Sequence, residues 1–159
     1  MAQKENNIIP MIFDEAFYRK MATQKWRQQD YKKAAEYYEK VLELSPKDFD
    51  IQQHYAQCLV KLNIGKKAER LFYENIVKDF HVAESFYELS QLNIELNEPN
   101  KAFLFGINYV ILSEDKDFRE MLEKTFEVTY TNEQKIELEA QLFSTQLLFQ
   151  FLFSQGRLE

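Results

Sequence analysis

The sequence has few of the residues that form tight turns, with only three glycines and three prolines among its 159 residues. β-Sandwiches and β-barrels need many such turns, so we expect an all-α fold instead. No apolar run reaches the roughly 18 residues of a membrane-spanning helix. The first ten residues are polar and mixed in charge, unlike a secretory signal. These absences predict a cytoplasmic protein with no membrane segment.

Residues that carry chemistry are also scarce. Cys58 is the only cysteine, which excludes an internal disulfide and is typical of a reducing compartment. Its apolar neighbours predict a small packed side chain rather than a nucleophile. The two histidines, His54 and His81, lack a metal-ligand spacing, and the three glycines are too far apart for a phosphate-binding loop. We therefore predict no enzyme activity, no cofactor and no metal site.

The charge and the aromatic content narrow the class of protein further. The net charge of −6 argues against a non-specific nucleic-acid binder, which needs a basic face to displace counterions from phosphate. Fourteen phenylalanines and nine tyrosines supply too much apolar surface for a disordered chain. We expect a folded acidic domain that does not bind nucleic acid.

A repeat organises the chain. Residues 30–46 have apolar side chains at helical spacing, and Pro46 ends the pattern. Ala34 in this helix recurs as Ala68 and again as Ala102, each 34 residues further on. Small residues at this period predict stacked helix pairs, because each pair needs a close approach at the same place.

The helix ends can be placed from capping residues. Asp14 and Asp48 are suited to the N-cap position, Pro99 suits a first helical turn, and Asn63, Ile64 and Gly65 together break the helix that ends at Leu62. The expected helices cover residues 14–28, 30–44, 48–62, 66–78, 83–96 and 99–113. Short turns between them predict antiparallel αα-hairpins.

The pattern resembles the tetratricopeptide repeat family over residues 14–113. The positions that carry the resemblance are Tyr18, Met21, Ala22, Ala34, Tyr38 and Pro46, then Tyr55, Ala56, Leu59, Ala68 and Phe72, then Phe86, Leu89, Ser90 and Ala102. The departures from the family pattern are Lys25, Gln52, Phe80, Asn93 and Gly106. The resemblance implies an all-α, right-handed α-solenoid of antiparallel helix pairs, with about three units and additional C-terminal helices.

The flanking segments differ from the repeats. Residues 1–13 are expected to form an N-terminal arm, and residues 114–159 an acidic helix followed by a long apolar helix. The acidic helix is expected to cap or continue the third unit. The apolar helix must be covered on every side, so exposed Phe149, Phe151 and Phe153 predict self-association, including a homodimer through this helix.

The last six residues are similar to the turn inside a repeat. We interpret the chain as the N-terminal piece of a longer array, because solenoids finish with a polar capping face. The alternative is a natural terminus whose aromatic helix folds back or dimerises. The arrangement is also loosely similar to larger uncharacterised tetratricopeptide proteins of Gram-positive bacteria.

In this family the first helices of successive units line a concave groove that binds protein segments. The matching positions here are Arg19, Thr23, Trp26 and Arg27, then Gln53, His54, Gln57, Val60 and Lys61, then Glu84, Tyr87, Glu88, Gln91 and Ile94. The charge of this set changes from basic in the first unit to acidic in the third. Trp26 and Tyr87 are candidate anchors for a partner, although core packing explains Trp26 equally well. Glu84 and Glu88 would repel a carboxylate, so we exclude the family branch that binds chaperone C-termini.

Three functions remain in competition. The first is a scaffold that binds a peptide or helix of a partner protein in the groove. The second is a chaperone of the type that serves translocator proteins in type III secretion, which also has three repeats and acidic charge. The third is a non-catalytic module of a longer multidomain protein.

Overall fold

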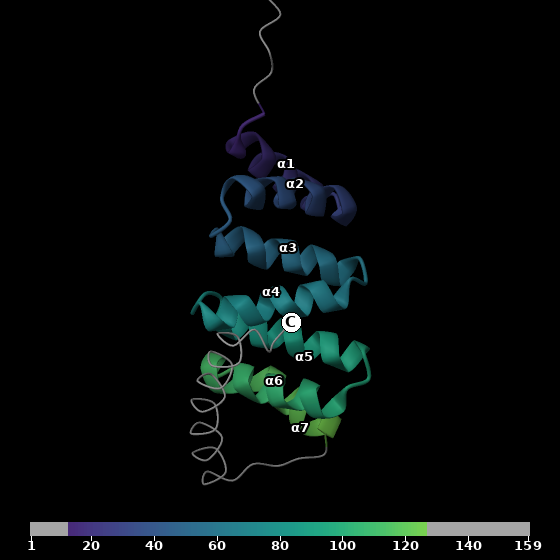
Figure 1. Cartoon of the computed structure of the whole chain (residues 1–159). Helices are drawn as coiled ribbons and strands as arrows, with labels where there is room; N and C mark the ends of the chain where they lie inside the picture. The colour runs from purple at the N-terminus through teal and green to yellow at the C-terminus, as the bar shows by residue number, and fades with distance from the viewer. Residues whose placement is uncertain (1–12, 127–159) are drawn as a thin grey trace, which may run out of the picture.

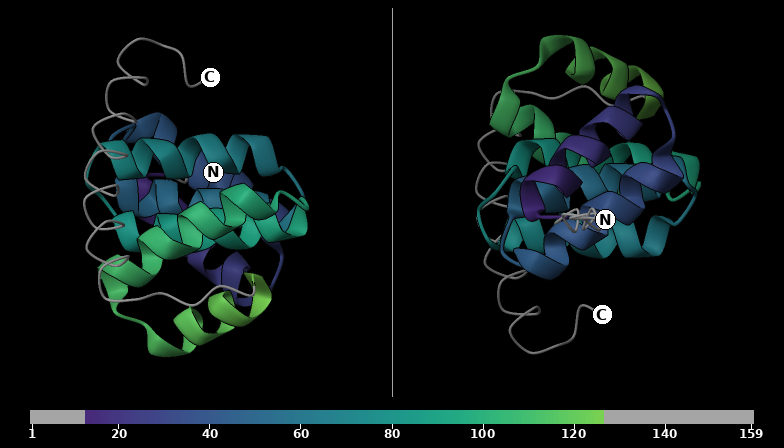
Figure 2. Two further views of the ribbon diagram at one scale, coloured as in Figure 1. Left: turned by 90° about the horizontal axis from the view of Figure 1, so that it is seen from below. Right: turned by 90° about the horizontal axis from the view of Figure 1, so that it is seen from above.

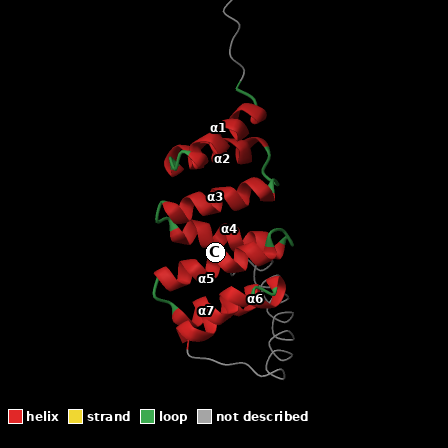
Figure 3. Ribbon diagram, turned by 180° about the vertical axis from the view of Figure 1, so that it is seen from behind, coloured by secondary structure: helices red, strands yellow, loops and turns green. Residues whose placement is uncertain are grey.

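The computed structural model describes residues 13–126. Over this range the chain forms seven helices and no strand (Figure 1, Figure 3). The helices are α1 (Glu15–Arg27), α2 (Tyr31–Leu44), α3 (Phe49–Lys61), α4 (Gly65–Val77), α5 (Val82–Glu95), α6 (Pro99–Ser113) and α7 (Lys116–Phe126). They follow one another along a single stack, which confirms the predicted all-α solenoid (Figure 1).

Aspartates begin four of the helices. The side chains of Asp14, Asp30 and Asp48 each accept a hydrogen bond from the backbone N–H three residues later, at 2.8, 3.3 and 3.0 Å. Asp115 does the same for α7 at 2.9 Å. Each bond satisfies a backbone donor that has no partner within the helix. The predicted caps at Asp14 and Asp48 are confirmed.

The turns inside the three helix pairs repeat at the same period as the alanines. Gln29, Asn63 and Asn97 all adopt left-handed backbone conformations, with φ of 58°, 59° and 56°. The next residue in each turn donates its backbone N–H to a carbonyl five residues earlier, at 3.0, 2.8 and 2.9 Å. This is the usual hydrogen bond of a helix that ends in a left-handed residue. The expected break over residues 63–65 is confirmed at Asn63, but Gly65 already belongs to α4, which begins one residue before the expected start at Lys66.

The small residues lie where helices approach most closely. All six small residues of the repeat are completely buried: Ala22, Ala34, Ala56, Ala68, Ser90 and Ala102. The Ser90 hydroxyl also donates to the Ala102 carbonyl at 2.8 Å, which joins α5 to α6. The interpretation of the 34-residue period as a packing requirement is confirmed.

The helix α7 packs against α6 at the end of the described stack, as the views along the stack show (Figure 2). A Cβ atom on Gly106 would lie 2.6 Å from Leu122 Cδ1 and 3.0 Å from Ser90 Oγ. Only glycine leaves room for Leu122, which explains why Gly106 departs from the family pattern. Helix α7, which begins at Lys116 and balances three acidic against three basic side chains, therefore continues the stack beyond α6. The apolar helix with Phe149, Phe151 and Phe153 lies outside the described residues.

Candidate functional site

The three helices that open the pairs, α1, α3 and α5, supply all the predicted binding residues. The Arg19 guanidinium of α1 forms an ion pair with Asp48, the N-cap residue of α3. Gln57 Nε2 of α3 donates to Glu88 Oε1 of α5 at 2.9 Å. We call the exposed and half-buried predicted residues of these helices the first-helix surface. The direct bonds between successive first helices make it continuous from α1 to α5.

Arg19 is already engaged at the α1 end of the surface. Its Nε donates to Glu15 Oε1 at 2.7 Å, in addition to the ion pair with Asp48. The hydrogen bond from the Ser45 hydroxyl, at 2.6 Å, and that from Arg19 lower the pKa of Glu15. Because two carboxylates compensate its charge, Arg19 mainly fixes α1 against α3, and the exposed Arg27 is the more available cation.

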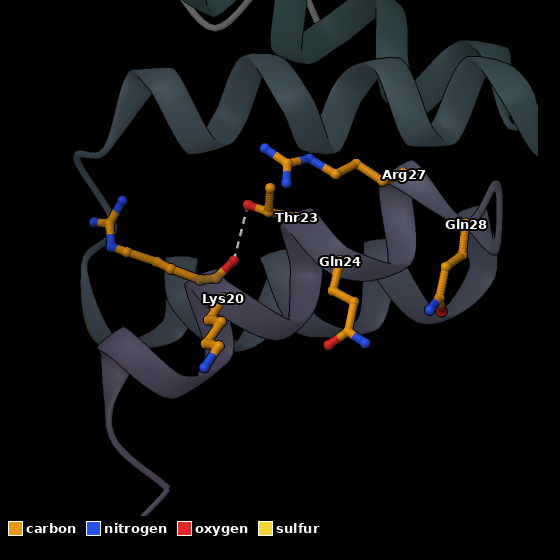
Figure 4. A pocket seen from close by; sticks show the side chains of 6 residues that line it. Lys20, Thr23, Gln24, Arg27 and Gln28 are labelled. Atoms are coloured by element: carbon orange, nitrogen blue, oxygen red, sulfur yellow. Dashed lines mark hydrogen bonds between the residues drawn. The ribbon is translucent and has the colours of Figure 1, made fainter.

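An open hollow of about 580 Å³ lies along α1 (Figure 4). It is lined by Arg19, Lys20, Thr23, Gln24, Arg27 and Gln28. Thr23 donates its hydroxyl to the Arg19 carbonyl at 3.0 Å, and Thr23 and Arg27 lie on a different side of α1 from Lys20 and Gln24 (Figure 4). The hollow belongs to one helix and carries three cationic side chains, so it suits an acidic or polar group of a partner.

Trp26 is positioned by the first helix pair. Its ring is half-buried, packs against the main hydrophobic core and meets Tyr31 edge-on at 5.2 Å between ring centroids. A side chain that joins α1 to α2 in this way chiefly stabilises the fold. Of the two expected roles for Trp26, the structure supports core packing.

Gln53 lies in the interior, so its expected place on the binding surface needs correction. Its side chain is 4% exposed. Gln53 Oε1 accepts hydrogen bonds from Asn75 Nδ2 of α4 at 2.6 Å and from the Ser85 hydroxyl of α5 at 3.1 Å. Adjacent helical residues point about 100° apart, and here both Gln52 and Gln53 turn toward neighbouring helices. In the sequence, the polar residues Asn75 and Ser85 among apolar neighbours were the signal that could have predicted this network.

The remaining α3 residues lie in the middle of the surface. His54 is exposed and its ring stacks on Tyr38, with centroids 5.9 Å apart and planes at 22°. Gln57 is half-buried through its bond to Glu88, and Val60 packs against the core. Lys61 is exposed and is the only lysine or arginine of α3.

The α5 end combines carboxylates with apolar groups. Tyr87 is 37% exposed and Ile94 38% exposed. The Tyr87 ring rests on Tyr109 of α6 and Phe118 of α7, at centroid distances of 5.2 and 5.3 Å. Burial raises the pKa of Glu88, although the hydrogen bond from Gln57 and the positive charge of Lys61 act to lower it. Glu84 is exposed, and Gln91 is half-buried.

The first helices also differ in net charge. Helix α1 has Arg19, Lys20, Lys25 and Arg27 against Glu15 alone, a net charge of +3. Helix α3 balances Asp50 against Lys61. Helix α5 has Glu84, Glu88 and Glu95 with no lysine or arginine, a net charge of −3. A partner that crosses these helices therefore meets opposite charge at the two ends.

Metal binding and thiol chemistry can be assessed between residues 13 and 126. No cluster of three or more histidine, cysteine, aspartate or glutamate side chains in this range could hold a metal ion. Cys58 is fully buried, and desolvation raises the pKa of its thiol to about 12. Such a thiol stays protonated near neutral pH and is a poor nucleophile. None of the helices in this range has the length and apolar character that crossing a bilayer requires.

Comparison with protein families gives one match, to the tetratricopeptide repeat, over residues 25–72. This segment contains the end of α1, the helices α2 and α3, and most of α4. Comparison with curated proteins and with solved structures gives no significant match. The matched segment, the buried small residues and the repeated turns agree with one another: residues 25–72 are similar to a tetratricopeptide repeat, within a solenoid of like helix pairs.

Proposed function

We propose that this protein is an interaction scaffold that binds a segment of a partner protein on the first-helix surface. Tetratricopeptide repeats are protein-interaction modules, and the all-helical fold is typical of non-catalytic scaffolds. The observation that carries the proposal is the pair Tyr87 and Ile94, two partly exposed apolar side chains on α5. Aromatic and aliphatic groups at a surface that also offers charges are typical of binding hot spots.

Burial and existing bonds narrow the set of residues that we propose as contacts. Trp26 and Gln53 support the fold, and Arg19 holds α1 to α3 through its two carboxylate partners. The proposed contacts are Thr23, Arg27, His54, Gln57, Lys61, Glu84, Tyr87, Glu88, Gln91 and Ile94, with Arg19 at one edge. This set is distributed over all three first helices.

Site-specific photo-crosslinking tests this proposal. A benzoylphenylalanine introduced at Thr23 or Gln91 places the reactive group on the first-helix surface. The same residue at Leu104 or Leu112 of α6, which are 43% and 41% exposed, places it on a second helix as a control. In cells that express the protein naturally, we expect crosslinked adducts with one partner from Thr23 or Gln91 and none with that partner from the α6 positions. Adducts from α6 alone, or no adduct from the first helices, would overturn the proposal.

A further inference from the structure

We infer that the exposed face of α5 takes a basic amphipathic helix of the partner protein, with lysine or arginine beside two apolar side chains. This inference rests on the proposed function and names the chemistry of the partner. It follows from three properties of α5: its unpaired carboxylates, the spacing of its exposed apolar groups, and the rigid support beneath Tyr87.

The carboxylates of α5 have no cation at ion-pair distance within the described part of the chain, although Lys61 of α3 acts on Glu88 from further away. Glu84, Glu88 and Glu95 form no ion pair there, and α5 contains no lysine or arginine. Several glutamates on other helices are paired: Glu39 with Lys67 at 3.2 Å, Glu43 with Lys40 at 2.8 Å, Glu98 with Lys101 at 3.7 Å, Glu120 with Lys124 at 2.7 Å and Glu123 with Arg119 at 2.9 Å. Three unpaired carboxylates on one helix attract cations from outside, and a partner with lysine or arginine supplies them.

Glu88 is the most specific of the three. It is half-buried, and Gln57 Nε2 donates to only one of its oxygens, Oε1. Burial disfavours the charged form of this carboxyl, so its pKa is raised. A partner cation at the other oxygen would favour the ionised form again and add a charge-assisted hydrogen bond.

The apolar groups define the shape of the occupant. Tyr87 and Ile94 are seven residues apart, which is two helical turns, or about 10 Å along α5. A partner helix that lies along α5 presents apolar side chains at the same interval when they are seven residues apart in its own sequence. The interval therefore favours an amphipathic helix over an extended strand.

Tyr87 is a preorganised contact. Its ring packs between Tyr109 and Phe118, which also meet each other at 4.9 Å between centroids. A ring held in place loses little conformational freedom on binding. Its exposed face can take either an apolar side chain or a cation from the partner.

Binding of designed peptides to the full chain tests the inference. The probes are three fluorescein-labelled 18-residue peptides: an amphipathic Leu/Lys helix, the same pattern as Leu/Glu, and a scrambled Leu/Lys peptide without an apolar face. In fluorescence anisotropy we expect the Leu/Lys helix to bind about tenfold more tightly than either of the others, because it alone matches both charge and pattern. Equal binding of the scrambled peptide would show simple attraction to an acidic protein and would overturn the inference.

Two matched pairs of variants locate the site. We expect Glu84→Gln/Glu88→Gln/Glu95→Gln to weaken binding of the Leu/Lys helix about tenfold. The control Glu36→Gln/Glu43→Gln/Glu98→Gln changes the net charge equally on other helices and should change the affinity less than about twofold. Likewise Tyr87→Ala/Ile94→Ser should weaken binding, whereas Leu104→Ser/Leu112→Ser should not.

The outcomes separate this inference from the proposed function. If crosslinks form from Thr23 or Gln91 but the Leu/Lys helix does not bind, the partner segment has another chemistry and the inference is wrong. If the control triple variant weakens binding as much as the α5 triple variant, the site on α5 is also wrong. Neither result affects the proposed scaffold function, which is contradicted only by the crosslinking outcomes stated above.

Discussion

The joint of α3 with α4 and α5 is held by buried hydrogen bonds, whereas the joint between α6 and α7 is held by apolar contacts. At the first joint, the completely buried Asn75 donates to Gln53 at 2.6 Å and accepts from Gln52 at 3.0 Å. The Ser85 hydroxyl of α5 completes the network. At the second joint, Leu122 of α7 fits over Gly106 of α6, and Phe118 packs beneath Tyr87.

The difference shows that one repeat geometry can be held by two kinds of chemistry. A buried polar network demands a particular partner for each group, so it selects one arrangement of the helices. An apolar contact is less directional and depends chiefly on the available volume. We therefore expect the polar joint to respond to lost hydrogen bonds and the apolar joint to changed volume.

The largest expected effect is at the apolar joint. Leu122→Ala should lower the free energy of unfolding of this joint by about 3 kcal/mol, because it removes buried methyl groups and leaves a cavity. Hydrogen exchange of residues 116–126 should accelerate, while that of α3 and α4 should change little. The exposed Leu112→Ala is the control. Unchanged exchange in α7 would contradict the assigned packing.

The polar joint should break when its central amide is removed. Asn75→Ala removes one hydrogen bond from each of the buried Gln52 and Gln53 and should cost about 2 kcal/mol in urea unfolding. Asn108→Ala is the matched control, because buried Asn108 donates only to the Leu104 carbonyl of its own helix, at 2.6 Å. Equal losses in the two variants would show that the network contributes no more than one local bond.

Added volume at the apolar joint should cause the next largest loss of stability. Gly106→Ala should destabilise the protein by about 1.5 kcal/mol, since its Cβ would collide with Leu122. The double variant with Leu122→Ala should lose less than the sum of the single losses, because the shortened side chain relieves the collision. Gly65→Ala is the control, because its Cβ would meet only the end of the Leu92 side chain, at 3.3 Å. Strict additivity would contradict the close fit.

The smallest effect concerns Glu88 on the surface between these joints. Its pKa is raised in the folded state, so its contribution to stability is greatest below the unfolded pKa and is lost as pH rises through the folded pKa. Glu88→Gln should therefore raise Tm at pH 7 and have little effect near pH 4. Thermal unfolding across this range checks the sign, with exposed Glu84→Gln as control. A lower Tm for Glu88→Gln at pH 7 would show that its charge stabilises the fold.

Short-range patterns predicted much of the architecture. The caps at Asp14 and Asp48, the helix start at Pro99 and the buried alanines of the 34-residue lattice all depend on neighbours within one or two helices. The break after α3 was also predictable, since Asn63 takes the left-handed conformation there, although Gly65 is already helical.

The candidate surface was predictable only in outline. Helical spacing put Tyr87 and Gln53 on first helices, but spacing alone does not say which neighbour each side chain meets. Gln53 is buried because Asn75 and Ser85, 22 and 32 residues further on, supply its hydrogen bonds. Trp26 turns inward because Tyr31 offers an aromatic edge across the first turn.

Local propensity and period are properties of the chain itself, so the helices, their caps and their order followed from the residues. The choice between core and surface depends on contacts between helices, which form only when the pairs stack. Those contacts decided that Trp26 and Gln53 support the fold, that Gly106 makes room for Leu122, and that the carboxylates of α5 remain unpaired. A side chain's exposure is set by what packs over it, and that is a property of the tertiary structure.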